Sequence, residues 1–146
     1  MEPDDIEIGR PLQVGERIQP VAGDIRIMID SDQDHEVILI ARDEERTEIV
    51  DAGPDAPYAV ERYDHGCEVT IRPSRMIGDL RYVLGAYSSN GTPNILATIS
   101  DPRVHLALPR SDSAAVSIYE FYEKQDWRIK ADGGRYAGGL QAMLSS

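Results

Sequence analysis

Cysteine is nearly missing from this sequence, and long apolar runs are missing altogether. The one cysteine among 146 residues, Cys67, cannot form an internal disulfide bond, which favours a reducing compartment. No segment approaches the ~20 consecutive apolar residues of a membrane-spanning helix. Residues 1–5 are acidic, where a signal peptide would be basic. We therefore expect a cytoplasmic protein that is not inserted in a membrane.

Basic residues are also scarce. Lys and Arg number 15 against 26 Asp and Glu, which gives a formal net charge of −11. This charge repels the phosphates of nucleic acids and of anionic lipids, and it attracts cations and basic partners. We therefore expect no nucleic-acid partner. The alternative that the acidity only keeps the protein soluble stays open.

The motifs of common catalytic and cofactor sites do not occur either. There is no Gly-x-Ser-x-Gly, no zinc-protease motif, and no P-loop lysine after the glycine pairs at 133–134 and 138–139. The three histidines, His35, His65 and His105, are too far apart in the sequence to form a metal-binding pair. We predict that the glycine pairs form tight turns and that the protein is not an enzyme. An enzyme with an unrecognised polar pocket is the alternative.

The sequence does contain a succession of short β-strand patterns. Isoleucine alternates at positions 25, 27 and 29, and residues 37–41 form a short apolar run typical of a strand buried on both faces. Such segments recur at roughly 8–12-residue intervals, as in a sandwich or barrel, and no strand–helix–strand alternation occurs. The expected strands cover residues 24–30, 37–41, 47–50, 67–72, 80–87, 95–99, 104–108, 115–122 and 127–130.

These patterns predict a single all-β domain over residues 1–146. We expect a two-sheet β-sandwich of short, mostly antiparallel strands, with a short helix or helical turn near residues 139–144. Residues 1–10 are expected to be loosely held. Asn90-Gly91 predicts a strong turn.

The C-terminal part carries a distinctive combination of residues. It runs from Tyr119-Glu120-Phe121-Tyr122 through a tight turn to Trp127-Arg128-Ile129-Lys130-Ala131, and it ends in Gly134-Arg135-Tyr136-Ala137-Gly138-Gly139-Leu140. In order, spacing and residue type, this block resembles the end of TerD-like proteins, the tellurite-resistance and stress-protein family. Weaker similarity continues upstream at residues 15–18, 27–30, 32–40, 67–71 and 80–84. The resemblance implies a two-sheet β-sandwich, a cytoplasmic location, calcium binding in loops at one end, and an association with tellurite resistance and general stress.

Asp30, Asp32 and Asp34 form a close group of carboxylates. On a strand all three side chains would point to one face, and in a loop they can converge. Calcium takes six to eight oxygen ligands, so three neighbouring carboxylates are a plausible start of a site. The spacing is not that of an EF-hand loop, because His35 replaces the required glycine and Ala41 the required glutamate.

Asp64 is the best candidate for the second half of such a site. Glu36 is a weaker candidate, and His65 is a secondary candidate for a softer metal. Asp30, Asp32, Asp34 and Asp64 are thus the predicted metal ligands, with Ca²⁺ as the cation that the TerD-like resemblance implies. The alternative is a solvated acidic turn, whose aspartates cap nearby backbone amides.

One departure from the TerD-like pattern favours a second hypothesis. The acidic insertion typical of the family is replaced here by residues 61–66. The chain could therefore be a metal-free interaction module that binds other stress or tellurite-resistance proteins through an exposed edge or its glycine-rich C-terminal surface. A redox role for Cys67 is not expected, because it lies on the inward face of its strand and acidic neighbours raise the pKa of a thiol.

Overall fold

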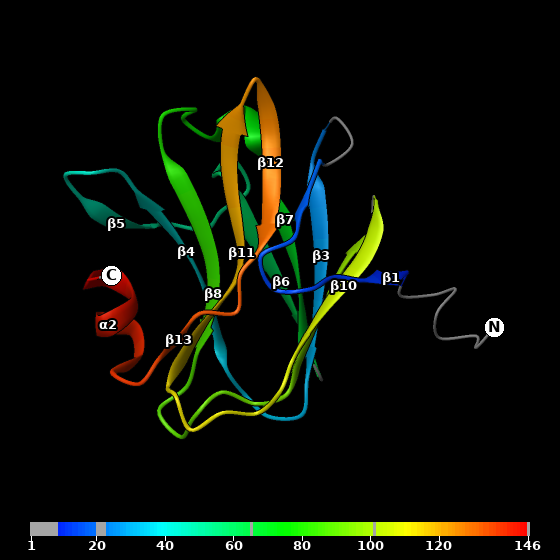
Figure 1. Ribbon diagram of the computed structural model, residues 1–146, viewed down its shortest axis with the longest axis vertical. Helices are drawn as coiled ribbons and strands as arrows, with labels where there is room; N and C mark the ends of the chain where they lie inside the picture. Colours follow the sequence, from blue (N-terminus) through cyan, green and yellow to red (C-terminus); the bar gives the residue numbers. More distant parts are fainter. Residues whose placement is uncertain (1–8, 20–22, 65, 101, 146) are drawn as a thin grey trace.

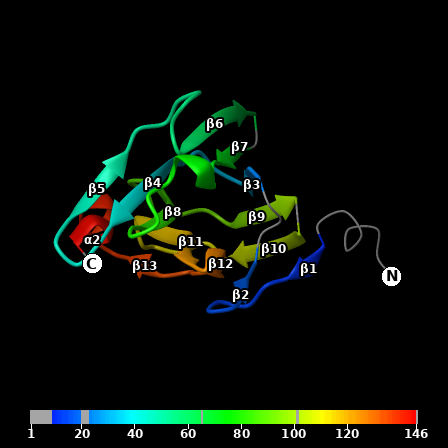
Figure 2. The same ribbon diagram turned by 90° about the horizontal axis from the view of Figure 1, so that it is seen from above.

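The computed structural model describes residues 9–19, 23–64, 66–100 and 102–145. In these parts of the chain, two β-sheets pack face to face as a sandwich (Figures 1 and 2). The predicted all-β, two-sheet fold is confirmed. Of residues 1–10, for which we expect a loosely held conformation, residues 1–8 lie outside the described part. Among the described residues, no helix is both long and apolar enough to cross a membrane.

Each sheet has its own set of strands. Sheet A has the order β1 (Arg10–Pro11), β10 (Arg103–Leu108), β9 (Ile95–Ser100), β3 (Ile25–Ser31), β7 (Gly66–Ile71) and β6 (Tyr58–Tyr63). Sheet B has the order β2 (Arg17–Ile18), β12 (Asp126–Ala131), β11 (Ala115–Lys124), β8 (Arg81–Tyr87), β4 (Glu36–Arg42) and β5 (Thr47–Val50), and β13 (Arg135–Tyr136) pairs with the start of β11. Strand β1 pairs with β10 in parallel, and the other pairings between these strands are antiparallel.

The core lies between the sheets, as the alternation of apolar residues predicts. Ile25, Ile27 and Ile29 of β3 are buried, whereas Arg26 and Asp30 on the same strand are exposed. Strand β7 alternates in the same way. Each buried aliphatic side chain contributes roughly 1.5–3 kcal/mol of transfer free energy, so these inward rows are the main source of stability.

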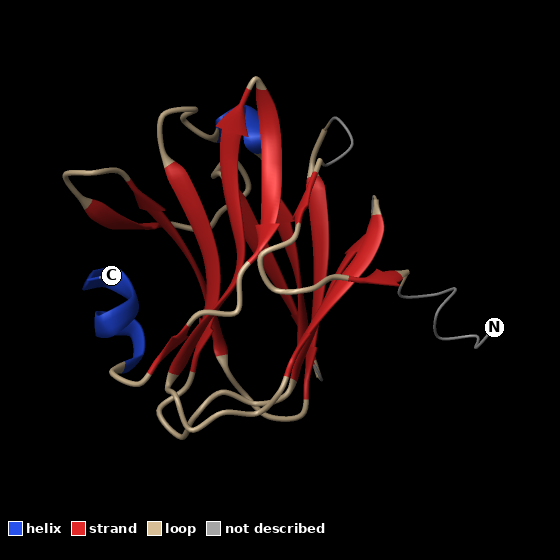
Figure 3. Ribbon diagram, viewed as in Figure 1, coloured by secondary structure: helices blue, strands red, loops and turns tan. Residues whose placement is uncertain are grey.

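The outer face of sheet B is covered at one end by helix α2 (Gly139–Ser145). Met143 of this helix packs with Ile38, Ile40 and Ala115 on the outer face of the sheet. This contact explains why β4 is apolar on both faces. Figure 3 shows the helix on the β4–β5 side of the sheet, away from the end where β11 turns into β12.

Strand β6 is not indicated by the sequence pattern. It spans Tyr58–Tyr63, whereas we expect no strand there and place the shortened acidic segment at residues 61–66. Tyr58 is buried but residues 61–63 are exposed, because β6 is the edge strand of sheet A, and an edge strand does not need strict alternation. The turn to β7 is therefore confined to the residues around Asp64.

Three connections run side by side at the lower end of Figure 1: β3–β4, β8–β9 and β10–β11. Each joins a strand of sheet A to a strand of sheet B. The expected turn at Asn90-Gly91 lies in the second of them, so it links the two sheets and is not the turn of a hairpin. We call this region the loop end.

Candidate functional site

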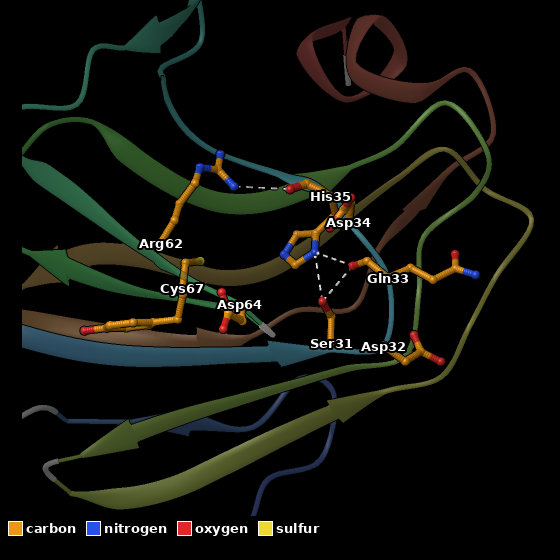
Figure 4. A pocket seen from close by; sticks show the side chains of 10 residues that line it. Ser31, Asp32, Gln33, Asp34, His35, Arg62, Asp64 and Cys67 are labelled. Carbon is orange, nitrogen blue, oxygen red and sulfur yellow. Dashed lines mark hydrogen bonds between the residues drawn. The ribbon is translucent and has the colours of Figure 1, made fainter.

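A polar cavity of about 160 Å³ opens at the loop end, between the β3–β4 loop and the β6–β7 turn (Figure 4). Three of the four predicted metal ligands, Asp32, Asp34 and Asp64, line it. The folding of the chain thus brings Asp64 to the same cavity as two aspartates that lie about thirty positions earlier. The complete lining is Ser31, Asp32, Gln33, Asp34, His35, Arg62, Tyr63, Asp64, Gly66 and Cys67.

Gly66 allows the β6–β7 turn to lie close against β3. It pairs with Asp30 across the ladder, and a Cβ atom at this position would collide with the carbonyl oxygen of Ile29. Only glycine fits this close approach of two backbones. The approach holds the turn that carries Asp64 beside the β3–β4 loop.

Asp30 does not belong to the cavity. Strand β3 ends at Ser31, so the alternation that would place the three neighbouring aspartates on one face stops after Asp30. Asp30 is exposed, alternating with the buried Ile29, and its side chain lies on the outer face of sheet A. Asp32 and Asp34 belong to the loop instead.

Asp32 is engaged by protein groups on both of its oxygens. Oδ1 accepts a hydrogen bond from the backbone N–H of Asn94 at 3.1 Å. Oδ2 accepts from Nδ2 of Asn94 at 3.0 Å and from the guanidinium of Arg110 at 2.8 Å. The hydrogen bonds from Asn94 and the charged contact with Arg110 lower the pKa of Asp32 against a partial desolvation. Arg110 thus neutralises Asp32 as a bound cation would.

His35 lines the same cavity and has one open ring nitrogen. Its Nδ1 lies 3.3 Å from the carbonyl oxygen of Gln33 and 3.1 Å from Oγ of Ser31, which itself donates to that carbonyl at 2.9 Å. When the hydroxyl of Ser31 donates to this carbonyl, Nδ1 can contact both oxygens only as a donor, and the ring proton is then on Nδ1. In that tautomer Nε2 carries a lone pair; it is shielded from solvent and has no hydrogen-bond partner among the residues that the structure describes. In Figure 4, this nitrogen is on the side of the ring where Arg62, Asp64 and Cys67 lie.

Asp34 and Asp64 are the two carboxylates of the cavity that are available to bind a ligand. Both are exposed, and neither forms a hydrogen bond or an ion pair with any residue that the structure describes. In the described ranges, no three Asp, Glu, His or Cys side chains come close enough together to hold a metal ion as they stand. Ligands from water or a rotation of the exposed aspartates would be needed to complete a coordination sphere.

The other candidates are less available. Glu36 forms an ion pair with Arg62 at 2.6 Å, which lowers its value as a ligand. His65 lies outside the described residues. Cys67 borders the cavity but is only 1% exposed, and burial raises the pKa of its thiol. We therefore expect Cys67 to stay protonated and unreactive near neutral pH.

The sequence does not indicate two features of this site. The first is Arg110, which reaches Asp32 from 78 positions away, and no local pattern predicts such a pair. The second is the open nitrogen of His35, which depends on the path of the loop between Ser31 and Gln33. A serine and a histidine on either side of Gln33, at alternate positions of a tight loop, are the only available signal in the sequence, and it is a weak one.

Comparison of the chain with protein-family models, with curated proteins and with solved structures gave no match. The resemblance of residues 119–140 to TerD-like proteins therefore stays a prediction.

Proposed function

We propose that the protein is a non-enzymatic binding protein that holds a divalent cation in the loop-end cavity, with Nε2 of His35 as one ligand. The proposal depends on the buried Nε2, which has no hydrogen-bond partner in the described part of the chain and carries a lone pair when Nδ1 is protonated. Metal-binding histidines commonly donate their other N–H to a backbone carbonyl, and Nδ1 of His35 lies 3.3 Å from such an oxygen, that of Gln33. Asp34 or Asp64, with water, would supply further ligands.

These donors suit a borderline cation such as Zn²⁺ better than Ca²⁺. Imidazole nitrogen is a good ligand for zinc, whereas calcium requires six to eight oxygens. Of the four aspartates predicted as calcium ligands, Asp32 is held by Arg110 and Asp30 lies outside the cavity. Calcium, which the TerD-like resemblance implies, is therefore the weaker candidate within this proposal.

We further propose that the chain is a cytoplasmic, TerD-like stress protein. The support is the block at residues 119–140, together with the two-sheet fold that the resemblance implies. A bound cation would connect the β3–β4 loop with the β6–β7 turn, and so alter the surface that the loop end offers to other stress or tellurite-resistance proteins.

The test is a calorimetric titration of the chelator-treated protein with Zn²⁺ and, separately, with Ca²⁺. We expect saturable Zn²⁺ binding that raises the melting temperature, because a ligand that binds only the folded state stabilises it. His35→Ala should abolish this binding and Asp64→Asn should weaken it about tenfold. Asp55→Asn, an exposed aspartate of the β5–β6 loop, is the control with the same charge change and should bind as the wild type does.

Two results would contradict the proposal. If neither ion gives a heat of binding or a change in melting temperature, the protein does not bind a cation at this site. Calcium binding that survives in His35→Ala would place the cation on carboxylates alone.

The Asp32–Arg110 ion pair favours a second candidate function. Because protein groups already tie the β3–β4, β8–β9 and β10–β11 connections together through Asp32, Asn94 and Arg110, the loop end does not need a cation to be ordered. The chain would then be a metal-free interaction module. Under this hypothesis, Arg110→Ala should lower the melting temperature while added Zn²⁺ leaves the wild type unchanged.

A further inference from the structure

The part of the outer face of sheet B that α2 leaves uncovered is rich in cations. We call it the basic face. Strand alternation places six basic side chains there. Five have a sequence neighbour that packs in the core (Ile18, Ala41, Tyr82, Ile129 or Ala131), and Lys124 lies three positions after the inward-facing Phe121 of the same strand. The six are Arg17, Arg42, Arg81, Lys124, Arg128 and Lys130, and they include both lysines of the chain.

The strand register brings these cations into direct proximity. Lys130 is paired across the strands with Arg17, and Arg81 with Arg42. Directly opposite like charges destabilise a sheet. The chain has 26 acidic residues, yet it places cations at both positions of each pair. Glu120 of β11 stands opposite Lys130 and forms an ion pair with Arg81, so one carboxylate serves two of these four cations, and an external anion could add to the compensation.

Internal compensation on this face is partial, because the register places Glu120 opposite Lys130 and Asp126 opposite Lys124. Arg81 pairs with Glu120 at 2.5 Å, and its guanidinium also lies 5.1 Å from the centre of the Tyr122 ring. Arg17, Lys124, Arg128 and Lys130 form no ion pair with the residues that the structure describes. Elsewhere in the described chain, four arginines do pair with carboxylates: Arg10, Arg46, Arg62 and Arg110.

The face is hollowed, and its shape suits an extended ligand. A shallow depression of about 640 Å³ is lined by five of the six cations, with Tyr122 and Glu123. From Arg17 on β2 to Arg42 on β4 there are four inter-strand steps, which is about 19 Å at the usual strand spacing. A single phosphate contacts only a small part of this width. An extended peptide of about six residues spans it.

Net charge limits the length of the ligand. The chain as a whole carries −11, so the rest of the molecule is on average negative. A long polyanion such as nucleic acid would extend beyond the face into this repulsive field. Salt screens charges only over a Debye length of about 8–10 Å, so the nearby carboxylates would still repel it. A short anionic segment stays within the basic face.

We propose that the basic face binds a short acidic segment, of about six residues, of a partner protein. This interaction surface is separate from the loop-end cavity and does not depend on the proposed cation. It is also distinct from the exposed edge and the glycine-rich C-terminal surface expected from the sequence.

The test measures binding of a fluorescently labelled peptide of six glutamates by fluorescence anisotropy. We expect saturable binding that weakens as salt is raised from low to physiological concentration, and no binding of the matching peptide of six glutamines. Arg128→Gln/Lys130→Gln should weaken binding about tenfold.

Arg26→Gln/Arg75→Gln is the matched control, because it removes the same two charges from outside the basic face. It should bind the peptide as tightly as the wild type, and both double variants should keep the wild-type melting temperature. Equal weakening in the two double variants, or no binding of the glutamate peptide, would overturn the proposal. Tighter binding of an oligonucleotide or of inorganic polyphosphate than of the peptide would also overturn it.

Discussion

Asp32 and His35 lie three positions apart in one loop, but they differ in how many of their polar atoms form hydrogen bonds. The carboxylate of Asp32 accepts three hydrogen bonds, two from Asn94 and one from Arg110. The imidazole of His35 uses Nδ1 within the loop, and its buried Nε2 has no partner among the described residues. Leaving a buried polar atom unsatisfied costs about 1–3 kcal/mol, so an open nitrogen is evidence for a ligand.

Asp32→Asn should change how stability depends on pH. The lowered pKa of Asp32 means that its carboxylate stabilises the folded state at any pH above the unfolded-state value of about 3.9. This contribution is lost as pH falls through the lower, folded-state pKa. Urea unfolding should therefore show the wild type more stable than Asp32→Asn near neutral pH, with the difference shrinking towards pH ~2. A difference that is the same at both ends of this range would contradict the role of the charge, and Asp55→Asn should show no difference at either end.

Tyr119→Phe should destabilise the sandwich by about 1 kcal/mol. The hydroxyl of Tyr119, on β11 of sheet B, donates to the carbonyl oxygen of Ala97, on β9 of sheet A, at 2.7 Å. The ring is completely buried, and burial raises the pKa of the phenol, so the hydroxyl stays a neutral donor. Chemical denaturation measures the change. Tyr63→Phe, at a side chain that is 50% exposed, is the control, and an equal effect in both variants would argue against the inter-sheet hydrogen bond.

At the scale of residues, the sequence predicts which side chains face the core better than which ones meet at a site. Ile27 and Cys67 are buried as their alternation indicates, because inward positions depend on the strand alone. The pairing of Asp32 with Arg110 depends on how separate loops meet, which local patterns do not contain. Asp64 was the exception, because it lies in the segment that corresponds to the acidic insertion of TerD-like proteins, and that resemblance suggested it as a partner of the earlier aspartates.

The β6–β7 hairpin is the element on which the cavity depends most. Gly66→Ala should lower the free energy of unfolding by about 2 kcal/mol or more, because the added methyl group collides with the backbone of β3 at Ile29. The same variant should weaken cation binding, because the turn with Asp64 has to move. Gly53→Ala is the control: its added carbon meets nothing closer than 3.9 Å, so thermal unfolding should change little. Wild-type stability in Gly66→Ala would contradict the close approach.

Strands with alternating or continuous apolar runs could be predicted from the sequence, and edge strands could not. Strands β3, β4 and β7 carry these patterns and lie inside the sheets. The edge strand β6 mixes Val60 with Glu61 and Arg62, and water satisfies its outer side. The short strands β1 and β13 have two residues each, too few for any period to show. Which strands belong to which sheet depends on tertiary packing, so this division could not be predicted from the sequence either.

On the scale of the whole molecule, charge is segregated. Open carboxylates gather at the loop end, at Asp34 and Asp64, while cations gather on the basic face of sheet B. The two regions lie on different parts of the sandwich, so a cation and an acidic partner segment could bind together. The C-terminal block that resembles TerD-like proteins contributes to the second region, because Tyr122, Lys124, Arg128 and Lys130 belong to it.

The most direct test of the central claim is a long-range ¹H–¹⁵N NMR correlation of the histidine rings, recorded with and without Zn²⁺. The resonances of His35 are identified by their loss in His35→Gln. We predict that the zinc-free protein shows a protonated Nδ1 and a bare Nε2, and that Zn²⁺ shifts the Nε2 resonance while Nδ1 keeps its proton. A protonated Nε2 in the zinc-free protein, or His35 resonances that do not respond to Zn²⁺, would contradict the cation site.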